Sequence, residues 1–335
     1  MRYSRRDFGK LALAGLPAAA MWKTVGETPL LALDKIPSKI GGVTIGAITY
    51  SFRAIQDPLE ILKAYTTIGL GEMELMSNHA EALAGIPGAG GGAGGRRGGA
   101  PLTPEQIAAR DAAAKAVSEW RKSATEATFK PVRKKIDDAG IDLRLLCYNM
   151  SDLRTQPDGR TTGTTDEDIE YGFMMAKWLG VEAMSTSTQV SMAKRIAPFA
   201  DKHKMMVGFH GHANTKDPNE VATPETFDAV MAASKYHGAN LDIGHYTEAG
   251  YDPVGFIEKH HARITSIHLK DRKLNEGPNM PWGQGDTPIK EVLQLMKKER
   301  YTFPATIELE YPSPEGSTVM AELAKCVKYA KVALA

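Results

Sequence analysis

The sequence predicts a (β/α)8 TIM barrel that forms a single domain over residues 42–333. From residue 42 onward, short apolar runs alternate with amphipathic segments, and the pattern repeats eight times. Eight such units in about 290 residues are typical of a closed parallel barrel. Several of the apolar runs also end in acidic or imidazole side chains. An open, doubly wound sheet is the alternative, but it more often carries a glycine-rich phosphate turn after an early strand, and this sequence shows none there.

The expected strands are the apolar runs at residues 43–52, 71–77, 141–150, 181–188, 204–212, 241–245, 264–270 and 303–311. The expected helices are at residues 57–68, 103–139, 166–179, 190–203, 224–236, 288–299 and 314–334, and one more fills the crossover after the sixth strand. Asp57-Pro58 and Thr103-Pro104 each place a capping side chain before a proline, which predicts the start of two helices. Pro131 predicts a break in the helix at residues 103–139.

Glycine dominates residues 85–100, which we expect to form a flexible loop, because so few side chains there can pack. A phosphate-binding loop is excluded, since no Gly-Lys-Ser/Thr sequence follows the glycines and no helix begins directly on them.

Residues 1–20 resemble a twin-arginine export signal. Ser4-Arg5-Arg6 precedes Phe8 and Lys10, and a mildly apolar run then ends in three alanines. The resemblance implies the twin-arginine translocase as a partner during export and a periplasmic or otherwise exported protein. We expect residues 21–41 to form an N-terminal linker before the barrel. The apolar run is too short for a stable membrane anchor.

The formal charge of +1 becomes −2 once the four basic groups and one acid of residues 1–20 are removed. This balance gives no electrostatic argument for binding nucleic acid. The two cysteines, Cys147 in an apolar strand and Cys326 in a C-terminal helix, suggest buried thiols rather than a disulfide framework.

Alternation along the strands separates apolar from polar side chains. At residues 71–77, Met73 and Leu75 share one face and Glu74 lies on the other, and later strands repeat the pattern. Because the apolar face of each strand must pack against the surrounding helices, the polar face points into the barrel. The inward polar residues near the strand ends are Glu74, His210, His212, Asp242, His268, Lys270, Glu308 and Glu310.

Carboxylates and imidazoles gathered inside a barrel are expensive to bury unless they pair with one another or bind a cation. A structural network of ion pairs is one interpretation. Two carboxylates and two imidazoles at the catalytic end of the barrel match the shell of a divalent metal better.

Four motifs follow one another on strand six, strand seven, the next loop and strand eight: Asp242-x-x-His245, His268-Leu-Lys270-Asp271, Trp282-Gly-Gln-Gly-Asp286 and Glu308-Leu-Glu310. Together with Glu74 and His210-Gly-His212, they resemble the sugar phosphate isomerase/epimerase family with its xylose-isomerase-like TIM barrel. The resemblance covers about residues 42–333.

The resemblance implies one divalent metal ion (Mn, Mg, Co, Zn or Fe) bound by His210, Asp242, His268 and Glu308. It also places His245 and His212 where family members contact substrate. One departure is that sugar epimerases of this family usually carry a glutamate at the position of His210, where it acts as one of two opposed bases. This puts a symmetric two-carboxylate mechanism in doubt and leaves open whether His210 or His212 binds the metal.

The expected chemistry is proton abstraction next to a sugar carbonyl, with a metal-stabilised enediolate. Candidates for the base are Glu308, Glu74 and His212. Lys270 could stabilise negative charge on an oxygen, or form an ion pair with Asp271 or Glu310. Two further residues are expected near the substrate: Glu310, and Trp282, which would either stack on a sugar ring or only pack.

The sequence therefore predicts a periplasmic, metal-dependent sugar isomerase or epimerase with a small carbohydrate substrate. A lyase or dehydratase acting on a keto-sugar or 3-keto-glycoside, similar to inosose dehydratase, is the alternative. A sugar-binding barrel without catalysis and a nuclease of the same superfamily are less consistent with the residues present, because the ligand set is intact and no basic groove is evident.

Overall fold

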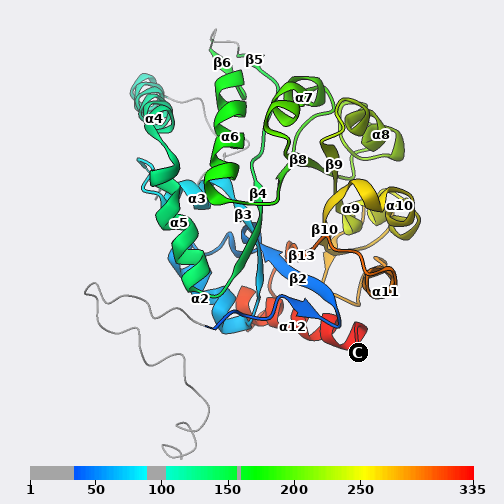
Figure 1. Cartoon of the computed structure of the whole chain (residues 1–335). Helices are drawn as coiled ribbons and strands as arrows, with labels where there is room; N and C mark the ends of the chain where they lie inside the picture. The colour runs from blue at the N-terminus through cyan, green and yellow to red at the C-terminus, as the bar shows by residue number, and fades with distance from the viewer. Residues whose placement is uncertain (1–33, 89–102, 157–159) are drawn as a thin grey trace, which may run out of the picture. The chain divides into compact units, whose positions relative to one another are not determined.

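The structure, a computed structural model, describes residues 34–88, 103–156 and 160–335 and confirms the predicted barrel (Figure 1). Its parallel strands follow the order β2-β13-β10-β9-β8-β7-β4-β3, and pairing of β3 with β2 closes the cylinder. The proposed export signal and residues 89–100 of the predicted glycine-rich loop lie outside the described residues. None of the described helices is both long and apolar enough to cross a bilayer.

The barrel strands are β2 (Val43–Ile48), β3 (Glu72–Met76), β4 (Asp142–Cys147), β7 (Ala183–Thr186), β8 (Met206–His210), β9 (His237–Asp242), β10 (Ile264–Leu269) and β13 (Ala305–Ile307). Short strands outside the barrel ring are β1 (Lys39–Ile40), β5 (Arg154–Thr155), β6 (Thr161–Thr162), β11 (Asp271–Arg272) and β12 (Asn279–Met280). β1 pairs antiparallel with β2, and β5–β6 and β11–β12 form separate two-stranded sheets.

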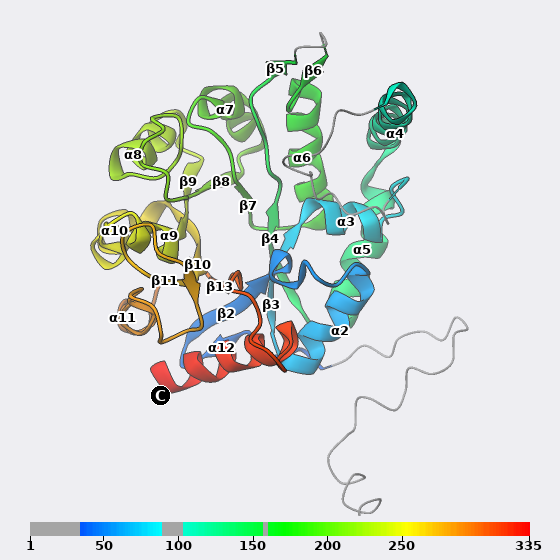
Figure 2. The same cartoon turned by 180° about the vertical axis from the view of Figure 1, so that it is seen from behind.

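Helices surround the strands in both views (Figures 1 and 2). They are α2 (Pro58–Ile68), α3 (Ser77–Leu83), α4 (Pro104–Ser123), α5 (Glu126–Asp138), α6 (Asp166–Leu179), α7 (Met192–His203), α8 (Pro224–Ala232), α9 (Ile243–Glu248), α10 (Pro253–His260), α11 (Ile289–Glu299) and α12 (Val319–Ala333). The predicted caps are confirmed, because the side chains of Asp57 and Thr103 accept hydrogen bonds from the first turns of α2 and α4.

Two predicted boundaries were wrong. The long helix breaks at Ala124 and Thr125, where a capping box starts α5, and Pro131 lies inside α5. The sixth strand begins earlier than expected and ends at Asp242, because the Asp242 side chain caps α9 by accepting the backbone N–H of His245 at 2.8 Å. The crossover that follows therefore contains both α9 and α10.

The described part of the predicted linker, residues 34–41, packs against the barrel. The N–H of Ile36 donates to Gly140 O at 2.9 Å, and Ser38 O accepts from Ile45 N at 2.8 Å. β1 then extends the sheet beside β2. This end of the chain also lies close to its C-terminal helix, since Leu334 O is 2.8 Å from the position that a Cβ on Gly41 would take.

The strand faces are sorted as the alternation predicts. Val207, Phe209, Leu241 and Ile267 are fully buried and belong to the apolar core that includes residues of the surrounding helices. The inward face is polar along much of its length, with buried Glu72, Glu74, Asn240, Ser266 and Thr306 below the mouth of the barrel. The hydrophobic core of this barrel therefore lies mainly between strands and helices.

Glu72 is a carboxyl group without a hydrogen-bond partner among the described residues, although it is completely buried. Gly46 makes room for it, because a Cβ on that glycine would lie 1.9 Å from Glu72 Oε2. Burial, reinforced by the charge of Glu74, holds the pKa of Glu72 well above its usual value. The protonated acid is therefore the form that the folded interior favours.

We expect Glu72→Gln to stabilise the protein increasingly as pH rises. The folded state keeps the Glu72 proton at pH values where the unfolded chain has released it, so this residue lowers stability as pH rises from the unfolded toward the folded pKa. The amide has no proton to lose, and its advantage should grow by about 1.4 kcal/mol per unit of pKa difference. Urea unfolding of both proteins at pH 4.5 and 8 measures this, and an equal stability difference at both pH values would contradict it.

Candidate metal-binding and active site

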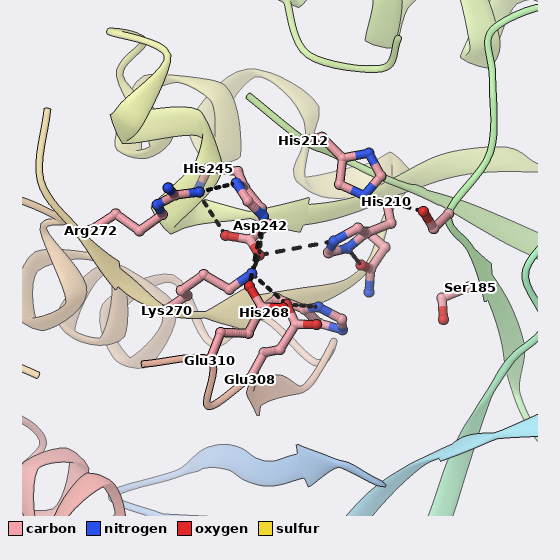
Figure 3. A network of polar contacts seen from close by, with 12 residues as sticks. Ser185, His210, His212, Asp242, His245, His268, Lys270, Arg272, Glu308 and Glu310 are labelled. Atoms are coloured by element: carbon pink, nitrogen blue, oxygen red, sulfur yellow. Dashed lines mark hydrogen bonds and ion pairs between the residues drawn. The ribbon is translucent and has the colours of Figure 1, made fainter. Parts of the chain in front are cut away.

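The C-terminal ends of the barrel strands surround a cavity of about 230 Å³. Imidazoles from β8 and β10 point toward Lys270 and the carboxylates of Asp242, Glu308 and Glu310 (Figure 3). The predicted site residues that line it are His210, His212, His245, His268, Lys270, Glu308 and Glu310.

The four predicted metal ligands come together. His210 ends β8, Asp242 ends β9, His268 is the penultimate residue of β10, and Glu308 directly follows β13. One donor atom from each lies within 4.8 Å of the corresponding atoms of the others, and all four residues are buried. Two imidazole nitrogens and two carboxylate oxygens at this spacing suit a divalent transition metal.

His210, and not His212, belongs to this cluster. Its Nε2 lies 4.0 Å from Asp242 Oδ2, while its Nδ1 lies 2.6 Å from Asn240 Oδ1. Since an amide oxygen only accepts, Nδ1 carries the proton and Nε2 is left with a free lone pair. Burial and the charge of His268 hold the pKa of His210 well below its usual value, which keeps the ring in the neutral form that a metal requires.

His268 is held between two carboxylates. Its Nδ1 lies 3.1 Å from Glu308 Oε2 and its Nε2 lies 2.8 Å from Glu74 Oε2. Burial alone would lower its pKa, but Glu74 and Glu308 raise it well above the usual value. A cation bound beside Glu308 would displace the Nδ1 proton, and Glu74 would continue to orient the ring through Nε2.

Glu74 itself is completely buried and does not line the cavity. Besides His268, its carboxylate accepts a hydrogen bond from the Ser185 hydroxyl. The structure therefore places this predicted base behind His268, in the position of an orienting carboxylate.

Lys270 is almost inaccessible, with 2% of its surface exposed. Its Nζ lies 2.8 Å from Asp242 Oδ2, 2.8 Å from Glu308 Oε2 and 2.6 Å from Glu310 Oε2. Burial opposes the charge, but the three carboxylates hold the pKa of Lys270 above its usual value, so the side chain is an ammonium. The ammonium in turn lowers the pKa of Asp242 and Glu308 against the effect of burial and keeps both as metal-competent anions.

Of the two ion pairs weighed for Lys270, the one with Glu310 forms and no pair with Asp271 is present among the described residues. The Asp271 carboxylate instead accepts the backbone N–H groups of Gly283 and Gly285 at 2.7 and 3.0 Å. Asp271 therefore anchors the loop that follows β11.

His245 contacts both Lys270 and a second basic residue that the sequence did not single out. Its Nε2 lies 3.1 Å from Lys270 Nζ, and its Nδ1 lies 2.8 Å from Arg272 Nη1 and 3.2 Å from Glu248 Oε2. Arg272 and Glu248 also form an ion pair with each other. Arg272 lies three residues after the end of β10. Glu248 lies three residues after His245 in α9, and this helical spacing could have identified Glu248 from the sequence.

Trp282 is not brought to this cavity. It lines a separate hollow of about 180 Å³ and packs edge-on against Tyr329 at a ring distance of 5.7 Å. Of the two expectations for this residue, packing is the one that the geometry shows.

Residues 108–329 match the model of a protein family described as the xylose isomerase-like TIM barrel. Among curated proteins, an inosose dehydratase of Geobacillus kaustophilus is 29% identical over 111 residues, which are 32% of this chain and 30% of that protein. The chain thus aligns with less than a third of the length of that relative.

Solved structures with the same fold include a sugar phosphate isomerase/epimerase from Parabacteroides distasonis, with a TM-score of 0.55, 17% identity, and coverage of 90% of this chain and 99% of that one. The probable 3-DHS dehydratase AsbF from Bacillus anthracis has a TM-score of 0.56 and 15% identity, with coverage of 85% and 98%. An IOLI protein with a bound zinc atom has a TM-score of 0.57 and 12% identity, with coverage of 87% and 97%. At these identities the likeness establishes the fold.

We expect Asp242→Asn to weaken divalent metal binding by about 100-fold, since it removes one anionic ligand from a site with four donors. Protein purified without chelator should contain about one divalent ion per chain, measured by elemental analysis, and titration with Zn²⁺ or Mn²⁺ would give the affinities. Asp286→Asn, at an exposed carboxylate outside the cluster, is the matched control. Equal metal affinity of Asp242→Asn and the original protein would refute the site.

Proposed function

Because the chain belongs to the xylose isomerase-like TIM barrel family, we propose that it is a metal-dependent enzyme that isomerises a small carbohydrate by removing a proton next to a carbonyl group. The observation that carries this proposal is the buried cluster of His210, Asp242, His268 and Glu308, three of which also line the cavity. A closed ion-pair network would not require such a cavity beside it.

A divalent cation held by these four residues supplies a Lewis acid that polarises the substrate carbonyl. The donor set fits such an ion, because His210 is neutral and Lys270 favours the ionised forms of Asp242 and Glu308. The ammonium of Lys270, at the wall of the cavity, is placed to stabilise negative charge on a substrate oxygen.

His212 is the base that the geometry supports best. It lines the cavity, with 32% of its side chain exposed, whereas Glu74 does not line the cavity and Glu308 belongs to the metal cluster. One base on one face of the substrate can move a proton between neighbouring carbons, as isomerisation requires. Epimerisation by two opposed carboxylates has less support, since His210 stands at one of the two expected positions and Glu74 lies behind His268.

Elimination from a keto-sugar or 3-keto-glycoside is the second candidate function. It is favoured by the pair of Lys270 and His245, whose nitrogens lie 3.1 Å apart beside the same cavity and could protonate a leaving oxygen. The partial likeness to an inosose dehydratase agrees with this reaction class.

Isomerisation and elimination can be distinguished by NMR after the protein is incubated in heavy water, once with free ketoses and once with 3-keto-glucosides. Isomerisation would place deuterium on the carbon next to the carbonyl, and elimination would release the aglycone. Glu308→Gln should reduce either activity by about 100-fold or more, because it removes an anion from the cluster. Glu315→Gln, at an exposed carboxylate, serves as control, and near-normal turnover by Glu308→Gln would remove Glu308 from the site.

The proposed location of this enzyme is the periplasm, supported by the twin-arginine pattern in residues 1–20. We expect replacement of Arg5 and Arg6 by lysine to retain the protein in the cytoplasm, because the translocase recognises the arginine pair. Cell fractionation followed by immunoblotting measures the distribution. Undiminished export of the double variant would argue against this route.

A further inference from the structure

His212 belongs to a chain of three polar side chains at the wall of the cavity. Its Nδ1 lies 2.5 Å from Glu220 Oε1 and its Nε2 lies 3.1 Å from Ser187 Oγ. His212 and Ser187 both line the cavity, while Glu220 approaches from the opposite side of the ring and does not line it. The carboxylate therefore acts on the imidazole, not on a ligand.

The fold holds Glu220 in this place through backbone contacts on both sides. Val221 O accepts the N–H of His212 at 2.8 Å, which ties the segment after β8 back onto the end of that strand. Glu220 forms an isolated antiparallel bridge with Gln189, and Val190 N donates to Asn219 O at 2.8 Å. The Glu220 side chain is only 23% exposed. These contacts distinguish it from a surface carboxylate that meets the ring by chance.

The chemistry of the contact fixes the tautomer of His212. An ionised carboxylate can only accept a hydrogen bond, so Nδ1 carries the proton and donates to Glu220, and Nε2 keeps its lone pair. That lone pair faces the Ser187 hydroxyl, and the backbone N–H of Ser187 donates to Asn149 Oδ1 at 2.8 Å. The nearest other rings are those of His210 and His245, at 5.0 and 5.7 Å from His212.

We propose that Glu220 is a positioning residue for the reaction: it holds His212 in the Nδ1–H tautomer with Nε2 directed into the cavity as the proton acceptor. This inference rests on the proposed function. The substrate C–H bond breaks, its electron pair stays on the substrate as the enediolate, and the proton goes to Nε2. The resulting imidazolium lies against the Glu220 carboxylate, and its proton exchanges with water. In isomerisation it donates a proton to the neighbouring carbon. In elimination it releases its proton to water, and Lys270 and His245 protonate the leaving oxygen.

Glu220→Gln tests this at constant pH. The amide can turn its NH2 group toward Nδ1 and so favour the opposite tautomer, with the proton on Nε2. We expect kcat to fall by about 100-fold or more, as for loss of general base catalysis, while KM stays within about threefold. Glu220→Asp keeps a carboxylate on the same backbone and should recover part of the lost kcat.

Asp217→Asn is the matched control, because it also replaces a carboxylate by an amide in the same loop. The Asp217 side chain accepts a hydrogen bond from the backbone N–H of Asn219 and makes no contact with His212. It should leave kcat nearly unchanged. An equal loss of kcat in Asp217→Asn and Glu220→Gln would reduce Glu220 to a structural role and overturn the inference.

The tautomer can be read without any substrate from the ¹⁵N NMR signals of labelled histidine, with His212 assigned by comparison with His212→Gln. We expect the Nδ1–H form in the original protein and its loss in Glu220→Gln. An unchanged tautomer would overturn the inference whatever the activity. Absence of turnover with every keto-sugar, combined with the expected tautomer change, would instead overturn the proposed function and support the positioning of His212 by Glu220.

Discussion

The central interaction of this structure is the contact of Lys270 with three carboxylates at one end of the barrel, where desolvation makes clustered negative charges unfavourable. Asp242, Glu308 and Glu310 approach one another closely, and the ammonium of Lys270 contacts all three. Without a cation among them, buried carboxylates so close together would take up protons or separate. Lys270 therefore favours the ionised forms of Asp242 and Glu308 and holds the three carboxylates together.

Much of this arrangement could be predicted, because it follows from two regular features of the chain. The period of two along each strand assigned Glu74, His210, His268 and Glu308 to the inside of the barrel, and burial confirms it. Parallel strands then align their carboxyl ends, so residues far apart in sequence come together. The choice between His210 and His212 could not be made this way, since both have the same parity on one strand. It was decided by Asn240, a residue of the neighbouring strand that orients only His210.

The features that escaped prediction depend on loops or on single contacts. Glu220 and Arg272 lie in or beside irregular segments, whose course no periodicity specifies. The start of α9 depends on one hydrogen bond from the backbone of His245 to Asp242, which turned a predicted strand end into a helix. Trp282 was expected above the cavity, yet the loop that carries it is pulled toward Asp271 and its ring packs on Tyr329.

Asp242 performs two tasks with its two oxygens. Oδ1 caps the first turn of α9, and Oδ2 is the atom that faces Lys270 and His210. The same carboxylate thus contacts both the helix that carries His245 and the polar cluster inside the barrel. Loss of this one carboxylate would therefore remove a helix cap and the ion pair with Lys270 at the same time.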